Sequence, residues 1–171
     1  LQWLASMLES LRAPDAVAAQ RMRAQALEQA PASAGAIDGR RFEWIADADS
    51  RLGPVCEMFI DGKYYWVPFA RINRIELGAP EDLLDLVGAG ARVTFESGGE
   101  KPVQIPVRYP GAESIDDDGL RMSRRTEWRG SDESGFLGLG QREWATDTEE
   151  HALLDVRVLQ DDCSGPRGSA W

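Results

Sequence analysis

The first 30 residues carry the hydrophobic spacing of two helices. Four leucines recur at intervals of three and four residues, namely Leu1, Leu4, Leu8 and Leu11. This spacing puts apolar side chains on one face of a helix over residues 1–12. Pro14 interrupts the pattern, and an alanine-rich run over 16–30 then extends to Pro31, which cannot continue a helical hydrogen-bond ladder. The sequence therefore predicts a helical hairpin over 1–32, at the end of a helical-repeat array.

Small residues over 33–40 predict a linker, after which the pattern changes to that of strands. Two apolar runs, 55–60 and 63–69, flank Asp61-Gly62, which is the strongest short-range signal for a β-hairpin. Counting outward from this turn pairs Phe59 with Tyr64, Met58 with Tyr65, Glu57 with Trp66 and Cys56 with Val67. Both faces of the hairpin are then largely apolar. Each face must therefore be covered by a barrel interior, a helix or a partner protein.

Further short apolar segments follow at the spacing of strands. They comprise residues 72–77, 91–97, 103–109, 126–129, 140–146 and 153–159. The segment 80–87 has acidic residues in its first turn and predicts a short helix. Together these elements predict an α+β fold, in which an antiparallel barrel-like or bent-sheet domain occupies 41–160. The polar, glycine-rich residues 161–171 predict a flexible tail.

Composition narrows the classes of function. The 171 residues include 29 acidic and 19 basic side chains, a formal net charge of -10, and most of the excess acid follows Gly111. Phosphate binding needs a basic patch, so nucleic acid is not expected as a partner. The acidic loops are either solvated surface or a docking surface for a basic partner. Cys56, Cys163 and the single His151 exclude a disulfide framework and a zinc site built from cysteine and histidine alone. Neither a membrane-spanning apolar run nor a secretion leader is present, so we expect a cytoplasmic protein without membrane insertion.

Candidate catalytic and metal-binding motifs each fail at a required residue. The segment 47–51 resembles the start of a calcium-binding loop, but Arg51 and Leu52 occupy positions that need a ligand and a glycine. Cys56 lies within an apolar strand, where inert buried cysteines are found, and so does not suit a nucleophile paired with His151. We therefore predict no catalytic residue, no metal site and no cofactor.

Aromatic and arginine side chains remain as candidates for binding. They are Trp44, Tyr64, Tyr65, Trp66, Tyr109, Trp128 and Trp144, with Arg71, Arg74, Arg108, Arg125 and Arg142. These residue types dominate the energetic centres of protein interfaces. Alternatively, the aromatic residues are core and the arginines pair with nearby acids.

Several strings of residues resemble one protein family. The longest are 42–54 (FEWIADADSRLGP) and 62–69 (GKYYWVPF), and shorter ones are 108–111 (RYPG), 124–128 (RRTEW), 138–142 (GLGQR) and 153–157 (LLDVR). In order and spacing they are similar to the ImpE family (TagJ or SciE type), accessory components of bacterial type VI secretion. The resemblance implies a tetratricopeptide-like helical region followed by a strand-rich C-terminal domain. We expect this chain to comprise the last helical pair and the whole C-terminal domain.

The resemblance also implies a function and partners. Members of the family are described as non-enzymatic adaptors that bind a helix of the small subunit of the contractile sheath and the ClpV unfoldase. We therefore predict a protein-interaction adaptor. The alternatives are a hydrolase or metal-dependent enzyme that uses the acidic face, and a structural sheath-associated subunit.

The predicted partner-binding or motif residues are drawn from these strings and from the aromatic and arginine set. They are Trp44, Asp47, Asp49, Arg51, Tyr64, Tyr65, Trp66, Arg108, Arg125, Trp128 and Arg142. We predict that Asp47, Asp49 and Arg51 form an ion-paired turn that joins the two regions. The alternative is that they contact a partner.

Overall fold

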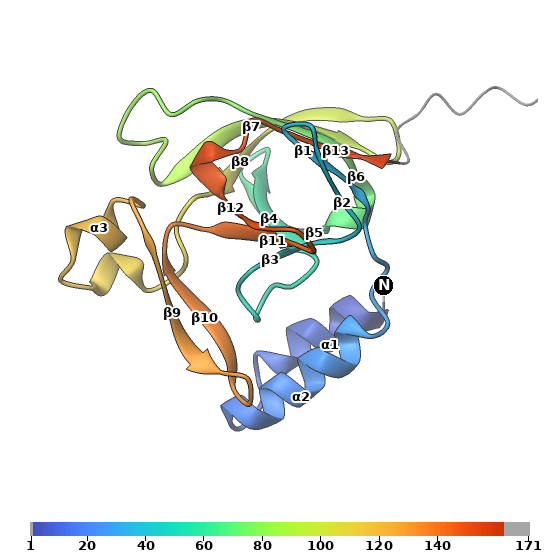
Figure 1. The fold of residues 1–171 in the computed structure, drawn as a ribbon, viewed down its shortest axis with the longest axis vertical. Coiled ribbons are helices and arrows are strands. Elements are labelled where there is room, and N and C mark those ends of the chain that lie inside the picture. Colours follow the sequence, from blue (N-terminus) through green and yellow to red (C-terminus); the bar gives the residue numbers. More distant parts are fainter. Residues whose placement is uncertain (1, 163–171) are drawn as a thin grey trace, which may run out of the picture.

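A computed structural model describes residues 2–162, and it begins with the predicted helical hairpin (Figure 1). Helix α1 spans Gln2–Ser10 and helix α2 spans Ala16–Leu27. Asp15 begins α2, because its carboxylate accepts a hydrogen bond from the backbone N–H of Ala18 at 2.7 Å. The hairpin is confirmed, whereas its place in a tetratricopeptide-like array stays a prediction. No helix among residues 2–162 is long and apolar enough to cross a membrane.

Only part of the leucine stripe lies on the face on which α1 packs. Trp3 and Met7 are buried against Val55 of the strand-rich region, whereas Leu8 and Leu11 are 46% and 50% exposed. A short helix buries one side, and here the large Trp3 side chain removes more apolar area from water than a leucine would. The spacing of leucines predicted the helix correctly, and of the described leucines in the stripe Leu4 packs against the buried cluster while Leu8 and Leu11 do not.

One antiparallel sheet of eight strands dominates the rest of the chain. Its order is β2-β1-β13-β6-β7-β8-β4-β5. The strands are β1 Gly35–Ile37, β2 Arg40–Phe42, β4 Val55–Ile60, β5 Lys63–Pro68, β6 Ile72–Leu77, β7 Gly88–Phe95, β8 Glu100–Pro106 and β13 Val158–Asp161. Figure 1 shows this sheet curving around an interior, as expected for an antiparallel bent-sheet domain.

Two smaller sheets and four short helical turns complete the fold. One sheet has the order β12-β11-β3, and β9 and β10 form a two-stranded hairpin. The bounds are β3 Ile45–Asp47, β9 Thr126–Ser131, β10 Gly135–Gly140, β11 Glu143–Thr146 and β12 Glu150–Ala152. The helical turns are η1 Phe69–Arg71, η2 Ala112–Ser114, α3 Asp118–Arg121 and η3 Leu153–Asp155. In Figure 1 the β9–β10 hairpin reaches from the curved sheet to the helical hairpin, and Arg23 of α2 donates to the carbonyl of Ser134 in the turn between these two strands at 3.1 Å.

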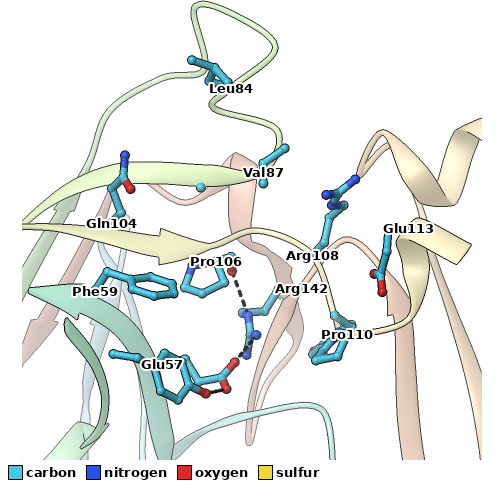
Figure 2. A pocket seen from close by; sticks show the side chains of 13 residues that line it. Glu57, Phe59, Leu84, Val87, Gln104, Pro106, Arg108, Pro110, Glu113 and Arg142 are labelled. Atoms are coloured by element: carbon cyan, nitrogen blue, oxygen red, sulfur yellow. Dashed lines mark hydrogen bonds and ion pairs between the residues drawn. The ribbon is translucent and has the colours of Figure 1, made fainter. Parts of the chain in front are cut away.

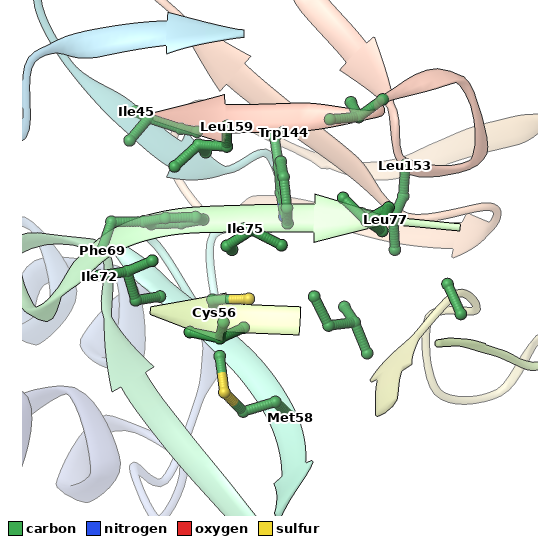
Figure 3. Packing of buried hydrophobic residues seen from close by; sticks show 14 of the residues in the cluster. Ile45, Cys56, Met58, Phe69, Ile72, Ile75, Leu77, Trp144, Leu153 and Leu159 are labelled. Carbon is green, nitrogen blue, oxygen red and sulfur yellow. The ribbon is translucent and has the colours of Figure 1, made fainter. Parts of the chain in front are cut away.

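The β4–β5 hairpin has the register that its turn predicts. Phe59 lies opposite Tyr64, and Met58 lies opposite Tyr65. Cys56 and Met58 belong to the main core, which also holds the edge-to-face pair Phe69 and Trp144 (Figure 3). One face of the hairpin is thus covered by the barrel interior. On the other face the helical hairpin covers Val55 and Trp66 but leaves Phe59 and Tyr64 exposed.

Several expectations about boundaries are wrong. The linker over 33–40 contains β1, which pairs with β2 and β13. The segment 140–146 is divided between β10 and β11, and 153–159 between η3 and β13. Asp161 belongs to β13 and is not tail, while residues 163–171 of the expected tail lie outside the described residues.

The expected helix over 80–87 is a series of turns. The Asp82 carboxylate accepts from the backbone N–H groups of Leu84 and Asp85, and the Asp85 carboxylate accepts from those of Glu81 and Asp82. Aspartate side chains offer the backbone an alternative to the helical hydrogen-bond ladder. The acidic residues that favoured a helix start in the sequence instead hold the turns together.

Candidate functional site

The centre of the candidate site is a buried arginine that bridges two carboxylates. Arg142 Nη1 donates to Oδ2 of Asp47 at 2.5 Å, and its Nη2 donates to Oε2 of Glu57. Its Nε donates to the carbonyl of Pro106 at 2.9 Å (Figure 2). The Arg142 side chain is 1% exposed and that of Asp47 is 0% exposed, so water does not screen the pair. We call Asp47, Glu57, Tyr109 and Arg142 the buried charge cluster.

Tyr109 closes the cluster on its remaining side. Its hydroxyl donates to Oδ1 of Asp47 at 2.9 Å, and its ring centroid lies 5.0 Å from Cζ of Arg142. Gly138 lies against the same ring, where an added Cβ would be only 2.2 Å from Cε2 of Tyr109. The ring of Trp128 contacts it as well, with 5.7 Å between centroids. Tyr109 therefore fits between these groups only because residue 138 has no side chain.

Burial and ion pairing shift the pKa values of Asp47 and Arg142 in opposite directions. Burial raises the pKa of Asp47 to about 6, although Arg142, the N–H of Asp49 and Tyr109 each favour the charged form. Burial lowers the pKa of Arg142, but the charges of Asp47 and Glu57 outweigh it and the net direction is upward. Burial also raises the pKa of the Tyr109 hydroxyl. Because neutral pH lies above the pKa of Asp47, the Asp47 carboxylate then faces Arg142 as an ion pair.

The turn after β3 holds an ion pair between Asp49 and Arg51, whereas the third residue of the predicted turn, Asp47, pairs with Arg142. The buried Asp49 carboxylate accepts from Arg51 Nε at 2.8 Å and Nη2 at 2.5 Å, and from the N–H of Gly138 at 2.8 Å. The hydrogen bonds that Arg51 donates to Asp49 raise the pKa of Arg51. At the end of this turn, a Cβ on Gly53 would lie 2.9 Å from the Leu27 side chain of α2. The turn therefore lies where the helical hairpin meets the strands.

A surface groove lies beside the buried charge cluster. Its volume is about 480 Å³, and its apolar lining consists of Phe59, Tyr64, Leu84, Val87, Pro106 and Pro110 (Figure 2). Its polar lining includes Glu57, Gln104, Arg108, Glu113 and Arg142. We call it the Tyr64 groove.

Glu57 connects the groove to the cluster. Its Oε2 faces Arg142, while its Oε1 accepts from the Tyr64 hydroxyl and from Trp66 Nε1, the latter at 3.2 Å. Trp66 Nε1 also lies 2.7 Å from the Tyr64 hydroxyl. Arg51 and Trp66 line a second pocket of about 240 Å³, which shares Glu57 and Tyr64 with the groove. The carboxylate therefore fixes the two aromatic side chains relative to the core.

The structure brings seven of the predicted site residues to the cluster, the turn or the groove. These are Asp47, Asp49, Arg51, Tyr64, Trp66, Arg108 and Arg142. Trp128 packs beside them on Tyr109. The structure does not bring in Trp44 and Tyr65, which are 41% and 43% exposed elsewhere, or Arg125, which pairs with Asp117 and Glu127 on the surface.

Glu57 is the functional residue that the sequence interpretation missed. It follows Cys56 and precedes Met58 in an otherwise apolar strand, and it is 7% exposed. A carboxylate in such a strand needs a buried cation or several donors, because an unpaired buried charge is very costly. That rule was the available signal, and it requires a buried cation or several donors without identifying them.

The titratable side chains near the groove are either buried away from it or held by other side chains. Asp47, whose pKa is raised, does not line the groove, and Glu57, which does, is bound by Arg142, Tyr64 and Trp66. Burial raises the pKa of the Cys56 thiol. Residues 2–162 contain no group of three or more histidine, cysteine, aspartate or glutamate side chains placed to hold a metal ion.

Comparison with known proteins now identifies the family. Residues 39–160 match the model of the ImpE protein family. The chain belongs to the ImpE family. Over 161 residues it is 41% identical to the type VI secretion system accessory component TagJ of Pseudomonas aeruginosa, a match that covers 92% of this chain and 56% of TagJ.

A solved structure shares the fold. The crystal structure of protein VPA1032 from Vibrio parahaemolyticus superposes with a TM-score of 0.83 at 25% sequence identity. The match covers 94% of this chain and 61% of that protein. The chain therefore spans little more than half the length of the proteins it matches.

Three of the six strings that resembled the ImpE family converge on the buried charge cluster and the turn after β3. The string 42–54 supplies Asp47 and Asp49, the string 108–111 supplies Tyr109, and the string 138–142 supplies Gly138 and Arg142. These residues are far apart in the sequence, since Asp47 and Arg142 are separated by 95 positions. What these ImpE strings have in common is therefore contact with one buried network.

Proposed function

We propose that this chain is part of a non-enzymatic adaptor of the bacterial type VI secretion system. The observation that carries the proposal is its 41% identity to the accessory component TagJ over 92% of its length. The adaptor links the small subunit of the contractile sheath to the ClpV unfoldase and works in the cytoplasm. A saturated buried charge cluster beside exposed aromatic side chains supports a binding role over a catalytic one.

The helical hairpin is proposed as the surface that receives a helix of the sheath subunit. Four apolar side chains of the hairpin are each at least 40% exposed, namely Leu8, Leu11, Val17 and Leu27. An amphipathic partner helix packs its own apolar stripe against exposed apolar side chains. Leu27 lies close to the Asp49–Arg51 turn, where it meets Gly53.

A binding experiment tests the adaptor. The full natural-length protein, immobilised, is incubated at moderate salt with purified sheath small subunit and, separately, with purified ClpV. We expect both to be retained, and the 171-residue chain measured alongside reports how much of each interaction it carries. If the natural-length protein retains neither, the adaptor proposal is wrong.

The role of the ion-paired turn is tested with Arg51→Ala. We propose a structural role, so the substitution lowers the unfolding midpoint as well as partner binding, because the buried Asp49 carboxylate loses two donors. Arg125→Ala serves as the control, since Arg125 is an exposed arginine that also pairs with carboxylates. Lost binding with an unchanged midpoint supports the alternative, a direct contact between Arg51 and a partner.

A further inference from the structure

The Tyr64 groove is flanked by two of the most exposed apolar side chains in residues 2–162. Leu83 is 69% exposed and Leu84 is 76% exposed, while Val87 beside them is 48% exposed. We infer that the Tyr64 groove is a docking site for a basic amphipathic helix of a partner protein. This site lies on the strand-rich domain, apart from the helical hairpin, and it does not depend on the sheath or ClpV as partners.

Hydrogen bonds within the loop fix the backbone that carries the exposed Leu83 and Leu84 side chains. The carboxylates of Asp82 and Asp85 accept four backbone N–H hydrogen bonds within residues 81–85. The backbone N–H of Gly88 then donates to the carbonyl of Leu84 at 3.0 Å. Because these polar groups are satisfied locally, the loop holds its apolar side chains in water without a partner.

The floor of the groove is fixed before any partner arrives. Glu57 is held by Arg142 and by the Tyr64 hydroxyl, and Arg142 is held by the carbonyl of Pro106. Figure 2 shows Glu57, Phe59 and Pro106 around this floor, with Leu84 and Val87 on the loop above it that leads into β7. A groove with a fixed floor loses little conformational entropy when it binds, which favours affinity.

Charge selects a basic occupant for the groove. Glu113 lines it, and Glu81, Asp82 and Asp85 belong to the loop that supplies Leu84 to its lining. Among residues 2–162 none of these four has a lysine or arginine nitrogen within 4.0 Å. The stretch 78–91 contains no lysine or arginine at all. Two cations also line the groove: Arg142 is paired with Asp47 and Glu57, and Arg108 donates from Nη1 to the carbonyl of Arg121 at 2.7 Å. A second copy of a chain with net charge -10 would bring like charges together, so a basic partner is favoured.

The sheet topology favours a helix over an extended strand. The floor is a face of the sheet, formed by side chains of β4, β5 and β8, and β5 is the last strand in the sheet order. A partner that lies in the groove rests on this face, so it binds through its side chains. A helix does this by placing apolar side chains three and four positions apart in the groove, with lysine or arginine flanking them toward the acidic loop.

The test uses two synthetic helical peptides that share a leucine stripe and differ in the polar face, which carries lysine in one and glutamate in the other. Fluorescence anisotropy measures binding of each to the 171-residue chain. We expect the lysine peptide to bind, and the glutamate peptide to bind at least ~10-fold more weakly, a difference typical of complementary against like charge at a rim. Added salt should weaken binding of the lysine peptide.

Matched variants locate the binding. Leu84→Ser should weaken binding of the lysine peptide by about tenfold, as for an apolar anchor in an interface, whereas Val17→Ser on α2 should leave it unchanged. The double variant Glu81→Gln with Glu113→Gln should reduce both affinity and salt dependence. Its control, Glu28→Gln with Glu133→Gln, removes the same charge elsewhere. Leu84 is exposed, so an unchanged unfolding midpoint shows that its variant remains folded.

Three outcomes would overturn the inference. They are failure of the lysine peptide to bind, equal binding of the two peptides, and equal loss of affinity in Leu84→Ser and Val17→Ser. None of them bears on retention of the sheath subunit or ClpV. The docking site and the adaptor proposal can therefore fail independently.

Discussion

Arginine and carboxylate side chains meet in two regions of this protein, with different consequences. In the buried charge cluster, Arg142 and its partner Asp47 are 1% and 0% exposed. Near α3, Arg125 is 45% exposed and pairs with Asp117 and with Glu127. The residue types are the same, but water can solvate the charged groups near α3 and cannot solvate those of the buried cluster. Burial therefore decides which arginine the fold depends on.

The strongest test of this contrast removes the buried cation. Arg142→Met should lower the free energy of unfolding by about 3–5 kcal/mol, because Asp47 and Glu57 would remain buried without a counter-charge. Equilibrium unfolding in urea measures the change. Adding Asp47→Asn and Glu57→Gln to the same chain should recover part of the loss, since no buried charge is then left unpaired. A loss below ~1 kcal/mol for Arg142→Met would mean that water reaches the cluster and that the contrast is wrong.

The two regions should also respond to pH with opposite signs. Burial raises the pKa of Asp47 from 3.8 to about 6, whereas the backbone N–H of Leu120 and the Arg125 side chain hold the pKa of Asp117 below 3.8. Between pH 3.8 and 6 folded Asp47 keeps a proton that the unfolded chain has released. This group therefore makes the protein less stable as pH rises through that window, by up to ~3 kcal/mol. For Asp117, stability is lost as pH falls through its lowered pKa.

The variant Asp47→Asn isolates the buried contribution, because asparagine does not titrate. Unfolding free energies of the natural chain and of this variant are compared from pH 4 to pH 7.5. We expect the natural chain to lose stability relative to the variant between pH 4 and 6, and the difference to level off above pH 6. A difference that grows in the opposite direction would show that pairing with Arg142 outweighs burial at Asp47.

Local signals in the sequence predicted local structure well. The turn Asp61-Gly62 fixed the register of β4 and β5 pair by pair, because a two-residue turn leaves a hairpin no other alignment. The helical hairpin followed from leucine spacing, but its buried face did so only in part. The buried face of α1 is the one that contacts Val55, and this strand residue is brought to α1 only when the chain folds.

The candidate site depended on contacts that no local pattern encodes. Asp47, Asp49 and Arg51 were found together because the turn is local, and its ion pair links neighbours two positions apart. Glu57 was missed because its partner Arg142 lies 85 positions away. A buried carboxylate in an apolar strand requires a cation or several donors, but the strand sequence does not show which residues provide them. The partner can therefore be identified only in the folded chain.

A smaller effect should follow from filling the space beside the cluster. In Gly138→Ala the new Cβ would lie 2.2 Å from Cε2 of Tyr109, so the ring or β10 must shift, at a cost of about 1–3 kcal/mol. The matched control is Gly90→Ala in β7, where nothing lies within 4 Å of the added Cβ. Thermal unfolding compares the two. Equal midpoints would mean that Tyr109 is free to move and does not rigidly close the cluster.

The smallest loss in free energy of unfolding is expected when the surface ion pairs of Arg125 are removed. Arg125→Ala removes the ion pairs with Asp117 and Glu127, but all three side chains are more than a third exposed. Water solvates the freed carboxylates, so the loss in free energy of unfolding should stay below about 1 kcal/mol and shrink further in high salt. Urea unfolding at low and high salt measures both quantities. If Arg125→Ala instead cost as much as Arg142→Met, exposure would not be what separates the two regions, and the α3 segment would have to be part of the structural core.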